Sequence, residues 1–138
     1  MTVIICDRTA LAGDSQATSS YGMTTCSKIF RLKKGEIVGI SGILVDGLLF
    51  IEWLKDGAEG KAPSMRSVEA LMLRNNTIWN YDSCSFAMRV GDKVAAIGSG
   101  AQFALGAYNA GASLKESVRI ACRLDPCSGG KTRCLYPK

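Results

Sequence analysis

The sequence contains no histidine, only three prolines, and no apolar run near the length of a membrane span. The absence of histidine excludes Ser-His-Asp and Cys-His catalysis, as well as zinc sites that use histidine. A membrane-spanning helix needs about 20 apolar residues, so we expect no membrane partner. The first seven residues, MTVIICD, lack the basic start of a signal peptide. We therefore expect a cytoplasmic protein. If it is an enzyme, its general base must be a carboxylate, a lysine, a tyrosine or an amine.

The chain is mildly basic, with 17 Lys and Arg residues against 12 Asp and Glu residues. A nucleic-acid-binding protein gathers such charge into one stripe and interleaves it with aromatic side chains. Here the basic residues are scattered over segments 28–34, 115–123 and 131–138. We interpret them as solvated surface charge and expect no nucleic-acid partner.

The six cysteines do not form a metal-binding pattern, because no pair has the two-residue spacing of a zinc site and no histidine completes one. They are also too sparse for a disulfide-stapled scaffold. We expect reduced thiols that pack mostly as small hydrophobic side chains. The cysteines are Cys6, Cys26, Cys84, Cys122, Cys127 and Cys134.

Length and composition predict a single domain over residues 1–138. β-Branched runs that flank turn residues predict hairpins at 3–12, 29–41 and 70–81. A further strand is expected at 93–97. The Ser- and Thr-rich segment 17–27 is expected to be an ordered loop.

Three segments have helical patterns. Residues 45–54 have apolar side chains on nearly all sides, which predicts a largely buried helix. Small residues over 101–111 predict a second helix, and the capping box formed by Ser113 and Glu116 opens a third. Hairpins with helices between them indicate an α+β sandwich rather than alternating βαβ units.

Three short motifs are weak when each is considered alone. Gly98-Ser99-Gly100 after a strand is either a phosphate cradle or a plain strand-to-helix turn, and the turn is favoured. The run DPCSGG at 125–130 is either a functional loop or a helix end followed by a turn. Asp14 is either a site residue or an ordinary turn aspartate.

In their order along the chain, six motifs resemble the proteasome β-subunit family, including its HslV-like members. They are TVII at 2–5, AGDSQAT at 12–18, SKIFRL at 27–32, GISG at 39–42 with Asp46, AIGSG at 96–100, and the DxxSGG pattern at 125–130. The resemblance covers residues 2–130 and is nearest to short bacterial or phage-encoded members. It implies the N-terminal nucleophile hydrolase fold, a four-layer α-β-β-α sandwich. One helix layer is expected to be shortened, because 58–67 look like a loop where the family has a helix.

The resemblance also implies a threonine-type peptidase. After removal of Met1, Thr2 would supply the hydroxyl nucleophile and its own α-amine would be the base. An α-amine titrates near ~7.7–8.0, so it can accept a proton at neutral pH. Lys28 would lie beside Thr2, Asp14 would pair with Lys28, and the Gly42 N–H would form the oxyanion hole. The remaining implied residues are Ser99, Asp125 and Ser128 around the terminal amine, and Ile40 and Leu44 in the substrate pocket.

No cofactor is required by this interpretation, although the resemblance implies a Na⁺ or Mg²⁺ ion on the backbone carbonyls of Leu124, Cys127 and Gly130. Implied partners are a peptide or unfolded-protein substrate, further copies in a homo-oligomeric ring, and an ATP-dependent unfoldase. Two alternatives stay open: a catalytically silent scaffold subunit, which retention of Met1 would favour, and a small-molecule amidase on the same fold.

Overall fold

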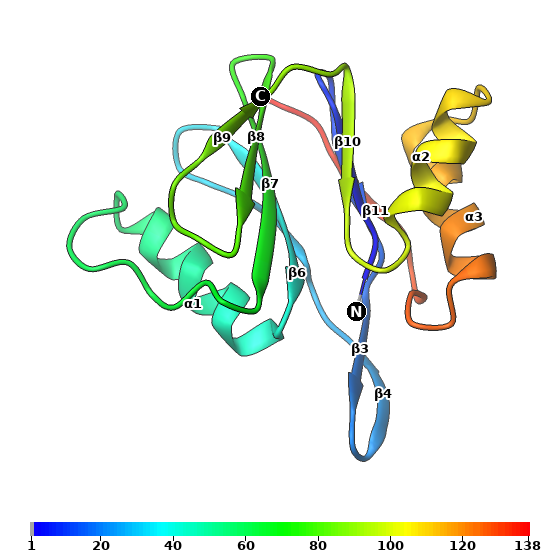
Figure 1. Cartoon of the computed structure of the whole chain (residues 1–138), viewed down its shortest axis with the longest axis horizontal. Helices are drawn as coiled ribbons and strands as arrows, with labels where there is room; N and C mark the ends of the chain where they lie inside the picture. Colours follow the sequence, from blue (N-terminus) through cyan, green and yellow to red (C-terminus); the bar gives the residue numbers. More distant parts are fainter. Residues whose placement is uncertain (1) are drawn as a thin grey trace.

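The computed structural model describes residues 2–138, so the expected removal of Met1 lies outside the described residues. The chain forms four layers: one helix, a five-stranded sheet, a four-stranded sheet and a helix pair (Figure 1). The helices are α1 (Leu44–Lys55), α2 (Ala101–Asn109) and α3 (Leu114–Leu124). The four-stranded sheet has the order β10-β1-β2-β11, with β1 (Ile4–Asp7), β2 (Leu11–Gly13), β10 (Val94–Ile97) and β11 (Arg133–Leu135). The five-stranded sheet runs β5 (Ile29–Arg31), β6 (Ile37–Gly42), β7 (Val68–Arg74), β8 (Thr77–Asp82) and β9 (Met88–Val90).

Three apolar cores lie between the four layers, and the first residues of the chain contribute to two of them. Ile4 points into the core between the two sheets, whereas Val3 and Ile5 point into the core beneath α2 and α3. Successive side chains of a strand alternate between its faces, so a strand covered on both sides is apolar throughout. A third core lies between α1 and the five-stranded sheet and contains Phe50. The α-β-β-α order predicted from the resemblance is confirmed.

The three predicted hairpins are confirmed as β1–β2, β5–β6 and β7–β8, and the predicted strand near 93–97 is β10. Asn75 and Asn76 turn the third hairpin with φ values of 50° and 57°, the conformation that a two-residue hairpin turn requires. The Ser113 hydroxyl caps α3 by accepting the Glu116 N–H at 3.1 Å. The short strands β9 and β11 were not predicted.

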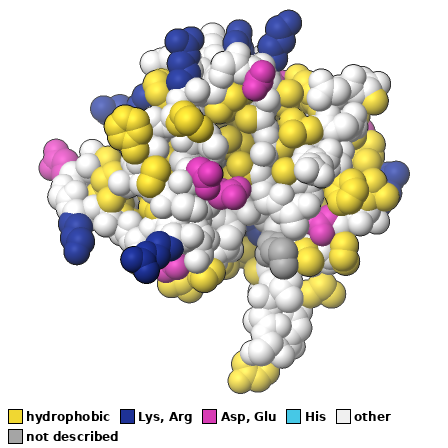
Figure 2. Space-filling model, viewed as in Figure 1, with side chains coloured by type: hydrophobic (Ala, Val, Ile, Leu, Met, Phe, Trp, Pro, Cys, Tyr) yellow, Lys and Arg dark blue, Asp and Glu magenta, His cyan; other side chains and the backbone are white. Residues whose placement is uncertain are grey.

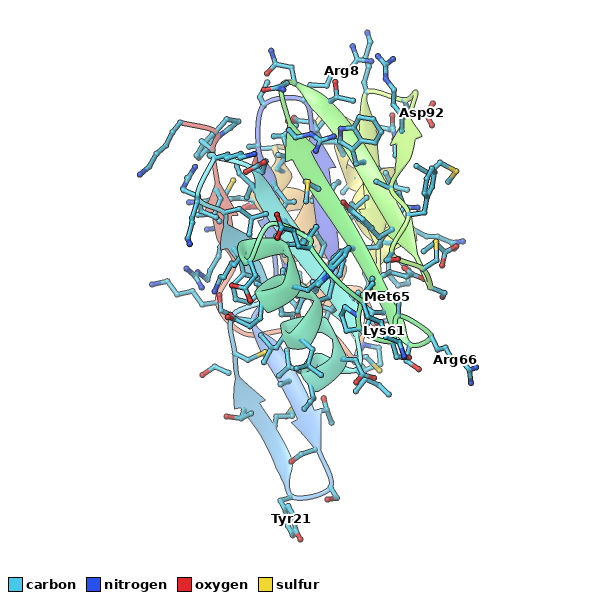
Figure 3. All side chains as sticks on the ribbon, turned by 90° about the vertical axis from the view of Figure 1, so that its left-hand side faces the viewer. Arg8, Tyr21, Lys61, Met65, Arg66 and Asp92 are labelled. Atoms are coloured by element: carbon cyan, nitrogen blue, oxygen red, sulfur yellow. The ribbon has the colours of Figure 1, made fainter. Side chains whose placement is uncertain are left out.

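The prediction of a loop over 17–27 is wrong. This segment forms a separate two-stranded hairpin, β3 (Gln16–Ser19) paired with β4 (Gly22–Thr25), which projects from the body of the molecule (Figures 1 and 3). Its strands bury little, so they lack the alternation of apolar and polar residues by which strands are found in a sequence.

The prediction of a largely buried α1 is also wrong. Only Gly47, Phe50 and Ile51 are buried in this helix, while Val45 and Leu49 are 66% and 54% exposed. The helix is the sole helix of its layer within residues 2–138, in agreement with the shortened layer that the sequence predicts. No helix in the described part of the chain is long and apolar enough to cross a membrane.

Candidate active site

Thr2 lies just before β1 and is held through its carbonyl group. The carbonyl oxygen accepts the Gly100 N–H at 3.1 Å, and the Ser99 hydroxyl lies 3.5 Å from it. Gly98 has a φ of 93°, and a Cβ atom there would lie 2.1 Å from the same oxygen. The turn between β10 and α2 therefore needs glycine to close around Thr2. Thr2 is almost completely buried.

Lys28 and Asp14 form a buried ion pair at the Thr2 hydroxyl. The Lys28 ammonium group donates to Thr2 Oγ1 at 2.6 Å and lies 3.0 and 3.1 Å from the two Asp14 carboxylate oxygens. The Lys28 and Asp14 side chains are only 6% and 0% exposed. A buried pair is tolerated when further hydrogen bonds satisfy its charges. Asp14 has them, because it also accepts the Thr2 hydroxyl and the backbone N–H groups of Val3 and Gly129.

A second polar cluster is centred on Asp125, at the end of α3. One oxygen of its carboxylate accepts the hydroxyls of Ser99 and Ser128, both at 2.6 Å, and the other accepts the Cys127 N–H at 3.0 Å. Burial by itself raises the pKa of Asp125, whereas these three hydrogen bonds lower it, and the pKa lies below its usual value. Ser99 connects this cluster to Thr2, whose carbonyl it approaches.

The lowered pKa of Asp125 predicts a pH-dependent contribution to stability. A carboxylate whose pKa is lower in the folded state stabilises the fold at pH values above its unfolded pKa of about 3.9. This stabilisation is lost as the pH falls through the pKa of the folded state. We expect Asp125→Asn to lower the free energy of unfolding at pH 7 by about 1.5–3 kcal/mol, the usual contribution of hydrogen bonds to a charged group. Urea denaturation at pH 7, 5 and 3 should show this deficit shrinking below pH ~4. An equal deficit at all three values would contradict it, and the exposed Asp92→Asn is the control.

A pocket of about 290 Å³ opens at the Thr2 hydroxyl. Five of the predicted site residues line it: Thr2, Lys28, Ile40, Gly42 and Leu44. Gly42 has a φ of 103°, and a Cβ atom there would lie 1.9 Å from the Ser67 carbonyl oxygen. The end of β6 can therefore carry only glycine at this position, which brings backbone rather than a side chain to the pocket.

No protein-family model and no curated protein matches the sequence. Solved structures do match the fold. HslV from Trypanosoma brucei superposes with a TM-score of 0.75 at 19% identity over 97% of this chain and 99% of that one. BPH from Thiobacillus denitrificans, in complex with epoxomicin, superposes with a TM-score of 0.73 at 18% identity over the whole of both chains. A second BPH structure superposes with a TM-score of 0.72 at 16% identity over 99% of this chain and 98% of that one.

This chain has the HslV fold. That fold is the N-terminal nucleophile hydrolase fold expected from the sequence motifs, so the predicted resemblance and fold class are both confirmed.

The HslV fold of this chain brings the nine predicted catalytic and substrate-binding residues into two adjoining groups. The pocket group lies around Thr2 and the second around Asp125; the Gly129 N–H links them by donating to Asp14. Asp14 and Lys28 are paired as the resemblance implies. The catalytic roles of these residues stay predictions.

Part of the pocket wall is formed by residues that were not predicted from the sequence. Gln16, Ala17, Thr18 and Cys26 line the pocket from the base of the β3–β4 hairpin. The first three lie within the AGDSQAT motif, which was the available signal. Ala17, Thr18 and Cys26 also lie within 17–27, which was interpreted as a loop. Ser41, which lies within the GISG motif, and Ile43 complete the lining.

Of the three residues predicted to hold an ion, Leu124 is the last residue of α3, and Cys127 and Gly130 lie in the loop after it. The six cysteine thiols are all free. Backbone carbonyls are hard oxygen ligands, which suit Na⁺ or Mg²⁺. Residues 2–138 contain no cluster of three acidic, cysteine or histidine side chains that would bind a metal instead. The ion at Leu124, Cys127 and Gly130 therefore stays a prediction that depends on carbonyl oxygens alone.

Proposed function

We propose that this protein is a peptidase in which Thr2, once Met1 has been removed, is the N-terminal nucleophile. The observation that carries the proposal is the Lys28 ammonium group 2.6 Å from Thr2 Oγ1, inside a pocket large enough for a side chain. A positive charge beside a hydroxyl favours its ionised, nucleophilic form. The absence of histidine leaves the α-amine of Thr2 as the base best matched to neutral pH.

Attack by Thr2 Oγ1 forms a bond to the carbonyl carbon of the scissile peptide, and the Oγ1 proton passes to the α-amine. The carbonyl electrons move to oxygen, and the Gly42 N–H donates to the resulting oxyanion. One such donor is worth about 2.7–4 kcal/mol of barrier in serine proteases. Lys28 and Asp14 hold the hydroxyl in place before the attack, because both are buried and bonded to it.

Collapse of this intermediate breaks the C–N bond, and the leaving amine takes the proton from the α-ammonium group. The acyl group then remains as an ester on Thr2. Water is deprotonated by the α-amine and attacks the ester carbon, the C–Oγ1 bond breaks, and the proton returns to Oγ1. Asp125, Ser99 and Ser128 position the first residue by fixing the turn that holds its carbonyl.

Two backbone edges beside the pocket favour an extended peptide as substrate. Strand β3 pairs only with β4 within residues 2–138, so its other edge is open. The second edge lies at the end of β6. Ser41 and Gly42 pair with β7 on one side, and on the other side β5 pairs only with residues 37–39, so the edge at 41–42 is open within residues 2–138. Extended peptides bind open strand edges through backbone hydrogen bonds, while side-chain pockets give specificity.

The pocket composition predicts a preference for large apolar residues before the scissile bond. Ile40, Ile43 and Leu44 line it, and its one cation, Lys28, is already bonded to Thr2 and Asp14. A basic substrate side chain would be buried without a partner, which is costly. We expect kcat/KM for Leu or Tyr to exceed that for Arg or Lys by about tenfold or more, which corresponds to 1.4 kcal/mol. A fluorogenic peptide panel with faster cleavage after Arg or Lys would contradict this.

The test of the proposal compares two forms of the same chain. In the mature form, intact mass should show the loss of Met1, and the protein should cleave peptides. In the control form an uncleaved tag stays attached before Thr2, so no α-amine is free at that residue. Equal cleavage by both forms would exclude the N-terminal mechanism, and no cleavage by the mature form would favour the silent scaffold. Because BPH has been solved with epoxomicin, we expect epoxomicin to inhibit only the mature form.

The proposal extends to a homo-oligomeric ring that receives unfolded protein from an ATP-dependent unfoldase. A Na⁺ or Mg²⁺ ion on the carbonyls of Leu124, Cys127 and Gly130 would stiffen the turn that carries Ser128. The shared fold supports the ring, whereas the unfoldase and the ion follow from the family resemblance alone.

A further inference from the structure

A second pocket, of about 360 Å³, adjoins the pocket at Thr2. The two pockets share Ser41 and Gly42 at the end of β6. The second pocket is also lined by Gly98 and Ser99, which belong to the turn that holds the Thr2 carbonyl. Gly98 lies against Thr2, since a Cβ atom at this glycine would be 2.9 Å from Thr2 Cγ2. The second pocket therefore reaches the same residue as the first.

The arrangement of the two pockets gives each of them a different part of a bound peptide. On the proposed function, the side chain before the scissile bond lies in the first pocket, beside Ile40 and Leu44. Gly42 faces the carbonyl group that is attacked and belongs to both pockets. A peptide that continues past Gly42 therefore brings the residue after the scissile bond to the second pocket.

A row of three polar side chains crosses the five-stranded sheet at the second pocket. Ser41 is paired with Glu69, and Glu69 with Asp82. Directly opposite residues of an antiparallel pair share one face of the sheet, and Leu71, two residues after Glu69, points into the core between the two sheets. The row thus continues the inter-sheet face beyond the apolar core. Like charges directly opposite each other are destabilising, and local rules of this kind are broken mostly at functional sites.

The negative charge of this row is not balanced by a neighbouring cation. Within residues 2–138, neither Glu69 nor Asp82 forms an ion pair. Arg66 also lines the second pocket, but it is exposed and its side chain points away from the body (Figure 3). Acidic side chains lie together near the middle of the face drawn in Figure 2. The pocket therefore offers carboxylate oxygens to whatever enters it.

We propose that the second pocket receives the residue that follows the scissile bond, and that Glu69, supported by Asp82, selects a basic side chain there. This inference rests on the proposed function and adds a second specificity to it. A Lys or Arg side chain has a long apolar stem and would place its charge at the two carboxylates, relieving their repulsion. An acidic side chain would add a third negative charge, and such like-charge contacts reject a partner.

The first test uses peptides that share Leu before the scissile bond and carry Arg or Glu after it. The wild type should cleave the Arg peptide with a kcat/KM about tenfold higher, which is a few-fold effect from each of two partly exposed carboxylates. Asp82→Asn should lower this ratio and Glu69→Gln/Asp82→Asn should bring it close to one. In 1 M salt, where charges are screened beyond about 3 Å, the wild-type ratio should also approach one.

Asp92→Asn is the matched control for these variants. It removes the same charge as Asp82→Asn, but Asp92 lies in the turn between β9 and β10, at the other end of the body from Arg66 (Figure 3). It should keep the wild-type ratio. Circular dichroism should show that all variants are folded.

A binding measurement keeps this inference separate from the proposed function. Thr2→Ala, with Met1 removed, should bind the fluorescently labelled Arg peptide about tenfold more tightly than the Glu peptide, and a further Glu69→Lys change should reverse this order. Failure to bind either peptide, equal affinity for both, or an unchanged preference in the Glu69→Gln/Asp82→Asn background would overturn the inference. If the preference is present but the wild type cleaves neither peptide, the second pocket is assigned correctly and the peptidase proposal alone is wrong.

Discussion

Thr2→Ala, with Met1 removed, is expected to abolish peptide cleavage while the fold remains intact. The change deletes the proposed nucleophile, and loss of a nucleophile costs about 10⁶-fold in kcat in a well-studied serine protease. The backbone contacts of residue 2 do not involve its side chain, because Gly100 binds the carbonyl group. Lys28 keeps both Asp14 oxygens as partners. Cleavage of the best peptide should be measured beside the wild type, together with thermal unfolding.

Thr2→Ser is the matched control for this experiment, since it keeps both the hydroxyl and the α-amine. It should retain partial activity. If the Ala variant cleaves as fast as the wild type, the nucleophile lies elsewhere. If the Ser variant is as inactive as the Ala variant, the hydroxyl alone does not explain the loss.

Lys28→Met is expected to damage both activity and stability. It removes the charge at Thr2 Oγ1 and leaves the Asp14 carboxylate, which is fully buried, without its cation. Breaking a buried ion pair by removing one partner costs about 3–5 kcal/mol. Urea denaturation should show a loss of this size, and peptide cleavage should fall close to background.

The double variant Asp14→Asn/Lys28→Met separates these two effects. Removing both partners of a buried pair is often nearly neutral for stability. We expect the double variant to recover most of the lost free energy of unfolding and none of the lost activity. If its activity recovers as well, the pair serves only to hold the fold, and the proposed activation of Thr2 by Lys28 is wrong.

Hairpins and helices that contribute side chains to a core could be predicted from the sequence. β1 and β2 have continuous apolar runs because helices cover one face and a second sheet the other. The β3–β4 hairpin could not be predicted in this way, because strands that bury little leave no periodic pattern of apolar residues. The exposure of α1 was missed for the opposite reason. Its apolar residues suggest burial, although the loop-like segment 58–67 already indicated that this layer lacks a second helix to cover them.

The candidate site was predictable as a set of residues but not as a network. The motifs place Thr2, Asp14 and Lys28 in a family pattern, and the structure brings them within hydrogen-bonding distance. The Gly129 N–H on Asp14 joins positions 115 residues apart, and local spacing cannot reveal such a contact. Cys26 was not predicted as a pocket residue, because its position in the pocket wall depends on the direction in which the β3–β4 hairpin projects.

The turn that Gly98 and Gly100 form around the Thr2 carbonyl allows the chain to fold before it becomes active. Thr2 is held through its carbonyl and hydroxyl groups, neither of which is altered when Met1 is cut away. The polypeptide can therefore reach its complete tertiary structure first and gain its free amine afterwards. On the proposed mechanism, the removal of Met1 rather than a folding step then makes each new molecule able to cut other proteins.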